Sequence, residues 1–220
     1  MSGKTHFKRL VPIIITLAFL LFSHPTMAEK PLVLLTTEKG EITLQLFPEL
    51  APKSVFGFLK LVEDFHYDGL IFHRVIEDFM IQSGGYTFDM TRRESTAPDI
   101  VSEASNGLQN KRGTVALART SDPNSARAQF FINHRNNPSL DPDSKQAGYT
   151  VFGEVISGMP VVDEIAKVPT GIFGDYQDVP KEPIRILSAK LLNPIVWEKL
   201  RPRKLSFERP LPAPRDRLID

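Results

Sequence analysis

Short strand-like segments separated by turn residues recur along the chain after residue 31. Residues 32–37 have the composition of a strand, and after the turn sequence Glu38-Lys39-Gly40 residues 41–47 alternate between polar and apolar, which predicts a β-hairpin with one buried face. Further short segments with strand-like composition are bounded by Gly, Asn, Pro and Asp, at residues 71–76, 79–82, 114–118, 129–133, 151–155 and 184–192. Together these segments predict about eight strands.

Two stretches follow the spacing of an amphipathic helix instead. The first begins near Pro52 and is expected to span about 14 residues. Its apolar positions recur at intervals of three and four: Val55, Phe56, Leu59, Val62 and Phe65. The second follows Gly158 and places four apolar residues on one face: Val161, Val162, Ile165 and Val168. A mainly β fold, a closed eight-stranded antiparallel barrel capped by two α-helices, accommodates these elements because closure removes exposed strand edges.

The first 28 residues have the order of a secretory signal peptide. Three cations without a nearby acid precede an apolar run at residues 10–22, and small residues stand three positions and one position before a cut after Ala28. As a helix the run would be about 20 Å long, short of the roughly 30 Å hydrocarbon core, so a retained membrane anchor is the less favoured alternative. We therefore expect export to the periplasm or secretion, with no stable membrane span after cleavage.

The composition fits one globular domain followed by a short tail. Of 220 residues, 41% are hydrophobic and 24% charged, and a net charge of +1 gives no support for a nucleic-acid-binding protein. The chain has no cysteine, which excludes disulfides and thiol catalysis and suits an oxidising compartment. Residues 29–193 are predicted to form the domain. Residues 194–220 are predicted to be a Pro-rich basic C-terminal tail, either an extended appendage attached through Trp197 or a loosely ordered terminus.

Several kinds of catalytic site are disfavoured by the motifs. His66, His73 and His134 are the only histidines after the predicted cut, and they lack the spacing of metal ligands. The chain also lacks a GxSxG nucleophile motif, a GxGxxG dinucleotide motif and a P-loop. We therefore expect neither a metal nor another cofactor.

The segment from residue 72 to 85 holds the most informative combination of side chains. On a strand Phe72, Arg74 and Ile76 share one face, and Phe79, Met80 and Gln82 follow on the next strand. A fixed cation, adaptable apolar surface and an amide would then lie together on the barrel wall. By itself, Arg74 would more simply be a surface ion-pair residue.

Three segments in order resemble the signatures of the cyclophilins, the barrel-shaped peptidyl-prolyl cis–trans isomerases. Residues 72–85 resemble the first signature, residues 129–133 the second, and residues 151–155 followed by Gly158-Met159 the third. The resemblance extends from about residue 31 to residue 192. The Ala118-Arg119-Thr120 sequence and the signal-like start are most similar to the bacterial periplasmic branch.

The resemblance implies an isomerase that accelerates rotation about X–Pro bonds in exported proteins and so aids their folding. Its substrates would be proline-containing polypeptides. It assigns catalysis to Arg74, Phe79, Gln82 and Phe131, with Gln82 orienting Arg74 and the substrate backbone. The proline ring would enter a pocket formed by Phe79, Met80, Phe131 and Leu140, and the adjoining groove would be lined by His73, Ala118, Arg119, Thr120, Gln129 and Tyr149.

Departures from the family pattern leave this assignment in place but affect ligand preference. Ser139 stands where many members have Trp, so we expect weak inhibition by cyclosporin. Two alternatives remain: a non-catalytic chaperone module that binds proline-containing peptides, and a transport barrel of the lipocalin kind. The second needs an open interior, whereas bulky residues alternate along these strands. No heptad pattern or large apolar excess is present, so we expect a monomer.

Overall fold

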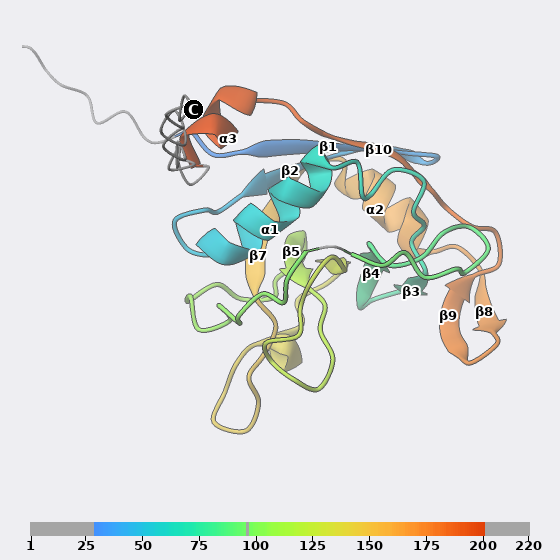
Figure 1. Ribbon diagram of the computed structural model, residues 1–220. Helices are drawn as coiled ribbons and strands as arrows, with labels where there is room; N and C mark the ends of the chain where they lie inside the picture. Colours follow the sequence, from blue (N-terminus) through green and yellow to red (C-terminus); the bar gives the residue numbers. More distant parts are fainter. Residues whose placement is uncertain (1–28, 96, 201–220) are drawn as a thin grey trace, which may run out of the picture.

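The computed structural model describes residues 29–95 and 97–200, and the predicted signal peptide lies outside them. Eight strands form one antiparallel sheet in the order β10-β1-β2-β7-β5-β6-β4-β3 (Figure 1). The strands are β1 (Leu32–Thr37), β2 (Gly40–Leu46), β3 (Arg74–Ile76), β4 (Met80–Ser83), β5 (Thr114–Leu117), β6 (Phe130–Asn133), β7 (Val151–Ser157) and β10 (Ile186–Leu191). The predicted mainly β, eight-stranded antiparallel architecture is confirmed.

The two ends of the sheet meet only at one corner, near the start of β3 and the start of β10. The outer strands β3 and β10 do not form a ladder along their lengths, but an isolated bridge links Ile71 to Arg185 just before them. The Phe72 N–H donates to the Ile184 carbonyl at 3.0 Å, and the Ile186 N–H donates to the Leu70 carbonyl at 2.7 Å. The predicted barrel closure therefore takes the form of a short seam, which satisfies backbone groups at that corner.

The β1–β2 hairpin follows directly from its alternating sequence. Val33 pairs with Leu44 and Leu35 pairs with Ile42, and all four side chains are fully buried on the inner face. Gly40 in the turn has a φ of +131°, and a Cβ there would lie 2.9 Å from a methyl group of Val161. The turn therefore needs glycine both for its backbone and for its close contact with the second helix.

Helix α1 (Pro52–Glu63) begins at a proline and buries Val55, Leu59 and Val62 as predicted, but not the two predicted aromatic residues. Phe58 is fully buried, whereas Phe65 is 67% exposed and lies beyond the end of the helix, at a φ of +56°. Phe56 lies on the outer side of the helix. Phe58 lies three residues after Val55 and four before Val62, so it fits the helical spacing as well as Phe56 does, and the prediction was wrong only in its aromatic residues.

Helix α2 (Met159–Ala166) buries Val162 and Ile165, as predicted. Figure 1 shows α1 and α2 beside the β1–β2–β10 part of the sheet. No helix within residues 29–95 and 97–200 combines the length and apolar character needed to cross a bilayer.

A hairpin of two strands and a third α-helix were not predicted. Strands β8 (Thr170–Phe173) and β9 (Tyr176–Pro180) form a separate two-stranded sheet next to β3 (Figure 1). Helix α3 (Pro194–Leu200) occupies the start of the expected tail, so an extended conformation is wrong for these seven residues. The attachment through Trp197 is confirmed: its side chain is 4% exposed, with its ring 5.3 Å from that of Phe56. Residues 201–220 lie outside the described residues.

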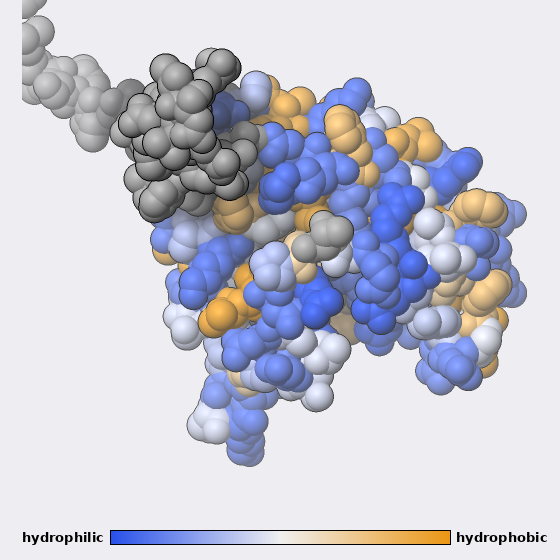
Figure 2. All heavy atoms as spheres, viewed as in Figure 1, coloured by the Kyte–Doolittle hydropathy of each residue, from blue (hydrophilic) through white to orange (hydrophobic). Residues whose placement is uncertain are grey.

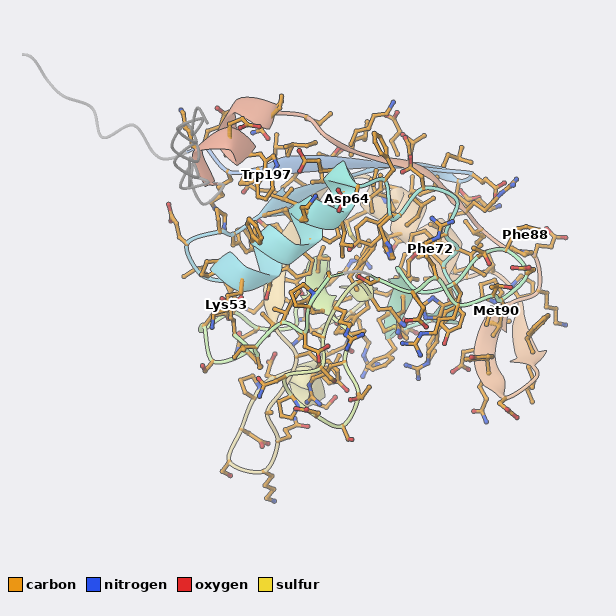
Figure 3. The ribbon with its side chains drawn as sticks, in the orientation of Figure 1. Lys53, Asp64, Phe72, Phe88, Met90 and Trp197 are labelled. Atoms are coloured by element: carbon orange, nitrogen blue, oxygen red, sulfur yellow. The ribbon has the colours of Figure 1, made fainter. Side chains whose placement is uncertain are left out.

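The labelled side chains in Figure 3 show how α1 and α3 lie in the molecule. Figure 3 shows Trp197 above α1, whose two ends carry Lys53 and Asp64, and it shows Phe88 extending away from the body of the molecule. On the face drawn in Figure 2, hydrophobic residues form several separate groups among hydrophilic ones. The expectation of a monomer stays a prediction.

Aromatic rings fill the interior of the barrel. The ring of Phe58 lies 5.0 Å from Tyr67, 5.5 Å from Phe130 and 5.1 Å from Phe152, measured between centroids, and all four side chains are fully buried. A transport barrel needs an open interior of ligand size. The packed rings therefore argue against the lipocalin-like alternative.

We expect Phe58→Ala to lower the free energy of unfolding by about 3–5 kcal/mol, because it removes a ring from the centre of the core. The matched control Phe65→Ala removes an exposed ring and should change it by no more than about 0.5 kcal/mol. Urea unfolding followed by the fluorescence of the single tryptophan measures both. Equal losses in the two variants would contradict the observed orientation of α1.

Candidate active site

A cavity of about 310 Å3 opens on the outer surface of the barrel. We call it the apolar cavity, and its lining residues are Arg74, Phe79, Met80, Gln82, Ala118, Arg119, Phe131, Leu140 and Tyr149. All nine belong to the site that the family resemblance predicted. They come from strands β3, β4 and β6 and from the segments between strands, so the fold brings together positions that are far apart in the chain.

Strand register explains how the key side chains meet. Arg74 on β3 pairs with Gln82 on β4, and Gln82 pairs with Phe131 on β6. These three residues thus form one row across neighbouring strands, on the outer face of the sheet. The adjacent row is Val75, Ile81, Ile132 and Val115, and its side chains lie in the main core. Because side chains alternate between faces, one register fixes both rows.

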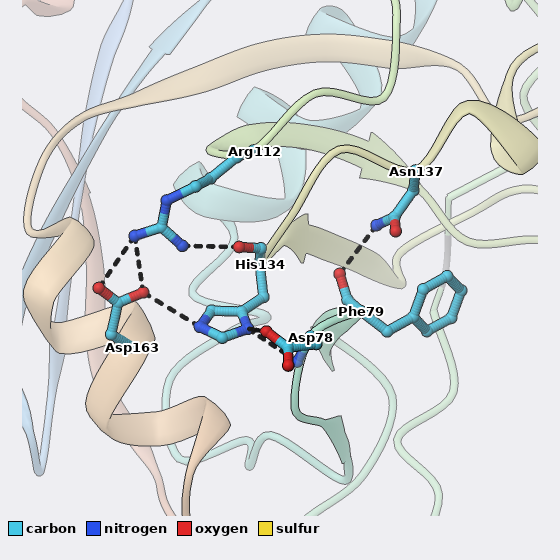
Figure 4. Close-up of polar contacts among 6 residues, drawn as sticks. All are labelled: Asp78, Phe79, Arg112, His134, Asn137 and Asp163. Carbon is cyan, nitrogen blue, oxygen red and sulfur yellow. Dashed lines mark hydrogen bonds and ion pairs between the residues drawn. The ribbon is translucent and has the colours of Figure 1, made fainter.

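The turn between β3 and β4 sets the position of Phe79. Its carbonyl accepts hydrogen bonds from the His134 N–H at 2.9 Å and from Asn137 Nδ2 at 2.8 Å. Asp78 adopts a φ of +55°, and its N–H donates to His134 Nδ1 at 2.9 Å. The turn therefore depends on His134 as both a donor and an acceptor (Figure 4).

His134 is itself held from the side of α2. Its Nε2 lies 3.1 Å from an Asp163 carboxylate oxygen, and Arg112 donates to both oxygens of the same carboxylate at 2.8 and 2.9 Å. Arg112 also donates to the His134 carbonyl at 2.6 Å. Since Nδ1 accepts from Asp78, the ring carries its proton on Nε2 and donates it to Asp163. The network ties one rim of the apolar cavity to helix α2.

Arg74 lies between two cavities. Besides the apolar cavity, it lines a second one of about 380 Å3, which also includes His73, Gln129 and Asp178. The closest carboxylate oxygen is Asp178 Oδ2, 3.6 Å from Arg74 Nε, and both side chains are about two-fifths exposed. The Arg74 guanidinium therefore has the Asp178 carboxylate on one side and the apolar cavity on the other.

Three polar residues of the predicted site line the second cavity together with Arg74: His73, Gln82 and Gln129. Gln82 Nε2 donates to Gln129 Oε1 at 2.8 Å, so the two amides are linked where the cavities adjoin. His73 is only 5% exposed, and its ring lies 4.7 Å from that of Tyr86. Burial lowers the pKa of His73 from 6.5 to about 4, because the charged imidazolium would lose its hydration. The imidazole is therefore neutral at neutral pH.

The remaining predicted groove residues line a third cavity of about 490 Å3. Ala118, Arg119, Thr120 and Gln129 contribute to it, together with Gln82. Arg119 donates from Nε to the Gly148 carbonyl at 3.0 Å, and its guanidinium lies 4.5 Å from the centre of the Tyr149 ring. All twelve predicted site residues thus line one of three cavities that share Gln82. Ser139 is exposed in the 3-10 helix η1 (Pro138–Leu140).

The hairpin β8–β9 supplies residues that sequence analysis missed. Asp175, Tyr176 and Asp178 line the second cavity, although no strand was predicted there. A signal was present, because Gly174-Asp175 is a two-residue hairpin turn between apolar residues. No group of three or more His, Asp and Glu side chains in the described ranges is arranged to hold a metal ion.

Comparisons with known proteins agree with this geometry. The family model described as cyclophilin type peptidyl-prolyl cis-trans isomerase/CLD matches residues 32–191. A peptidyl-prolyl cis-trans isomerase of Acinetobacter baylyi is 48% identical over 179 residues, which cover 81% of this chain and 94% of that protein. Peptidyl-prolyl cis-trans isomerase A of Dickeya dadantii is 46% identical over 188 residues, which cover 84% and 98%.

Solved structures give the same result. A crystal structure of a cyclophilin-type peptidyl-prolyl cis-trans isomerase from Cryptosporidium parvum aligns with a TM-score of 0.61 and 25% identity, covering 74% of this chain and 97% of that one. A second structure of that protein, determined in the presence of the dipeptide Ala-Pro, aligns with a TM-score of 0.60 and 26% identity, covering 73% and 98%. Fold, signature segments and relatives agree, and the chain belongs to the cyclophilin-type peptidyl-prolyl cis–trans isomerases.

Proposed function

We propose that this isomerase acts on X–Pro bonds of exported polypeptides, with Arg74 as its catalytic cation and the apolar cavity as the site of the proline ring. The observation that carries this proposal is the row of Arg74, Gln82 and Phe131, which places a guanidinium beside an aromatic wall. The Ala-Pro dipeptide used with the Cryptosporidium parvum relative is a ligand of the matching kind.

The chemistry needs electrostatic stabilisation rather than a nucleophile. Rotation about an X–Pro bond must cross a barrier of about 18–20 kcal/mol, because it breaks amide resonance. Acceleration by about 10⁴-fold requires roughly 5.5 kcal/mol of selective stabilisation of the twisted state. No covalent bond forms or breaks. The enzyme therefore has to bind the twisted bond more tightly than either planar form.

Arg74 is suited to that selective binding. In the twisted state the prolyl nitrogen regains its lone pair and becomes a hydrogen-bond acceptor. A guanidinium is always charged and presents several donors in a rigid fork, so it stabilises this nitrogen without a proton transfer. Phe79, Phe131 and Leu140 would hold the ring while the preceding carbonyl rotates. The linked amides of Gln82 and Gln129 retain N–H groups for the substrate backbone.

Export is proposed from the sequence alone. Residues 1–28 have the order of a signal peptide, and a chain without cysteine carries no thiol that could mispair in an oxidising compartment. Under this proposal the substrates are proline-containing proteins that fold after export. The non-catalytic chaperone alternative lacks a supporting observation, because the isomerase relatives and the Arg74 site both favour turnover.

We expect Arg74→Ala to lower kcat/KM by at least about tenfold, because it removes the donor that stabilises the twisted bond. Arg74→Lys should remain impaired, since an ammonium lacks the fork. Exchange spectroscopy on a peptide with a single Ala–Pro bond measures the rate, and circular dichroism checks the fold. Arg135→Ala, at an exposed position away from the three cavities, is the matched control. Wild-type turnover in Arg74→Ala would exclude the proposed role.

The pH dependence should lack a step from His73. Because its pKa is about 4, this residue stays neutral between about pH 6 and 8 and should add no step to kcat/KM there. A step near pH 6.5 that disappears in His73→Gln would contradict this.

Stability should change with pH in a defined direction. As pH falls from 6.5 towards 4, His73 takes up a proton in the unfolded chain before it does so in the folded one. Its contribution to the free energy of unfolding is therefore present above pH 6.5 and lost as pH falls to about 4. Urea titrations across this range should show a smaller decline in His73→Gln than in wild type.

For export, we expect the mature protein to begin at Glu29 and to be recovered from the periplasmic or secreted fraction. Mass spectrometry of the fractionated full-length chain identifies its first residue. A chain expressed without residues 1–28 should stay in the cytosol and remain active. Recovery of an uncleaved chain from the membrane pellet would instead support the anchor.

A further inference from the structure

The β8–β9 hairpin is fixed against the site at two points. Val179 is buried in a small cluster with Ile71 and Met90. The Tyr86 hydroxyl donates to that of Tyr176 at 3.2 Å, and the two rings pack edge to face with centroids 5.2 Å apart. Asp178 lies between these anchors, so its backbone is held from both sides.

The backbone at Asp178 is unusual. Its φ is +59°, and the register of the hairpin shifts between Gly171 and Phe173 on the facing strand. Such irregularities redirect a side chain, and they are frequent beside active sites. A left-handed conformation is uncommon for a residue other than glycine, although aspartate and asparagine tolerate it best. The distortion coincides with a carboxylate beside Arg74.

The geometry of the pair leaves most of the guanidinium available. The closest approach is at Nε, 3.6 Å from Asp178 Oδ2, so the two terminal amino groups lie farther from the carboxylate than Nε does. Asp178 lines the second cavity, whereas the apolar cavity is lined without it. The carboxylate therefore contacts Arg74 from outside the proposed proline site.

We propose that Asp178 is a positioning residue for Arg74. A half-exposed arginine has many rotamers, and only those that direct its fork into the apolar cavity serve catalysis. A carboxylate fixed near Nε favours this subset and leaves the terminal amino groups for the prolyl nitrogen. The inference rests on the proposed role of Arg74, and it adds a residue outside the three family signatures.

The first test separates charge from structure. Asp178→Asn keeps the size of the side chain and suits the same backbone conformation, so it removes only the charge. We expect kcat to fall about three- to fivefold, in the range of a partly exposed ion pair. KM should change less than about twofold, because the proline site itself is intact. Glu182→Gln removes an exposed carboxylate just after β9 that lines none of the three cavities, and it should match wild type.

A spectroscopic readout follows Arg74 directly. The NMR signal of its Nε–H group is identified by its absence from Arg74→Lys. In Asp178→Asn this signal should shift, whereas in Glu182→Gln it should not. Unfolding in urea establishes that both variants are folded.

A double-mutant cycle distinguishes failure of this inference from failure of the proposed function. In an Arg74→Ala background, Asp178→Asn should change kcat/KM by less than about 1.5-fold, because Asp178 acts through Arg74. Wild-type kcat in Asp178→Asn, with activity lost in Arg74→Ala, would overturn the positioning role and leave Arg74 in place. Equal losses from Asp178→Asn in both backgrounds would also overturn it. Full activity in Arg74→Ala would remove both proposals.

Discussion

The alternation of side chains across one strand register is the constraint on which the molecule depends. Val75, Ile81 and Ile132 face the core, and their neighbours Arg74, Gln82 and Phe131 face outward. A slip of one residue would expose the first row and bury a guanidinium, at a large cost in free energy. The hydrophobic core therefore fixes the position of the site, although the site contributes little to the core.

This separation suits a reaction without covalent chemistry. The site has to offer a cation, a wall for a ring and a few amide groups in constant positions, and rigid strands provide that better than mobile loops. The parts that lie on turns are tied down individually. The Phe79 carbonyl is held by His134 and Asn137, and the hairpin that carries Asp178 is anchored by Val179.

Local patterns in the sequence were sufficient where one periodicity dominated. The β1–β2 hairpin and the buried residues of α2 followed from alternation and helical spacing, and the nine residues of the apolar cavity followed from the family resemblance. Periodicity failed at the aromatic residues of α1, because Phe58 packs against Tyr67, Phe130 and Phe152 in the core, whereas Phe56 contacts Trp197 of α3. It also failed at Asp178, whose importance comes from a contact about one hundred residues away in the chain. Tertiary packing determined both positions.

The two rows also explain which positions can vary without loss of the fold. Ile81 and Ile132 belong to the main hydrophobic core, which residues from several strands build together. A substitution at either position therefore disturbs packing across that core. Ser139 is exposed and Arg119 lies at a cavity wall, outside the main core. Changes there alter what the surface offers a ligand while the register stays fixed. The presence of serine rather than an aromatic residue at position 139 therefore affects ligand preference. The position of Arg74 depends instead on the buried row of Val75, Ile81 and Ile132 and on Asp178.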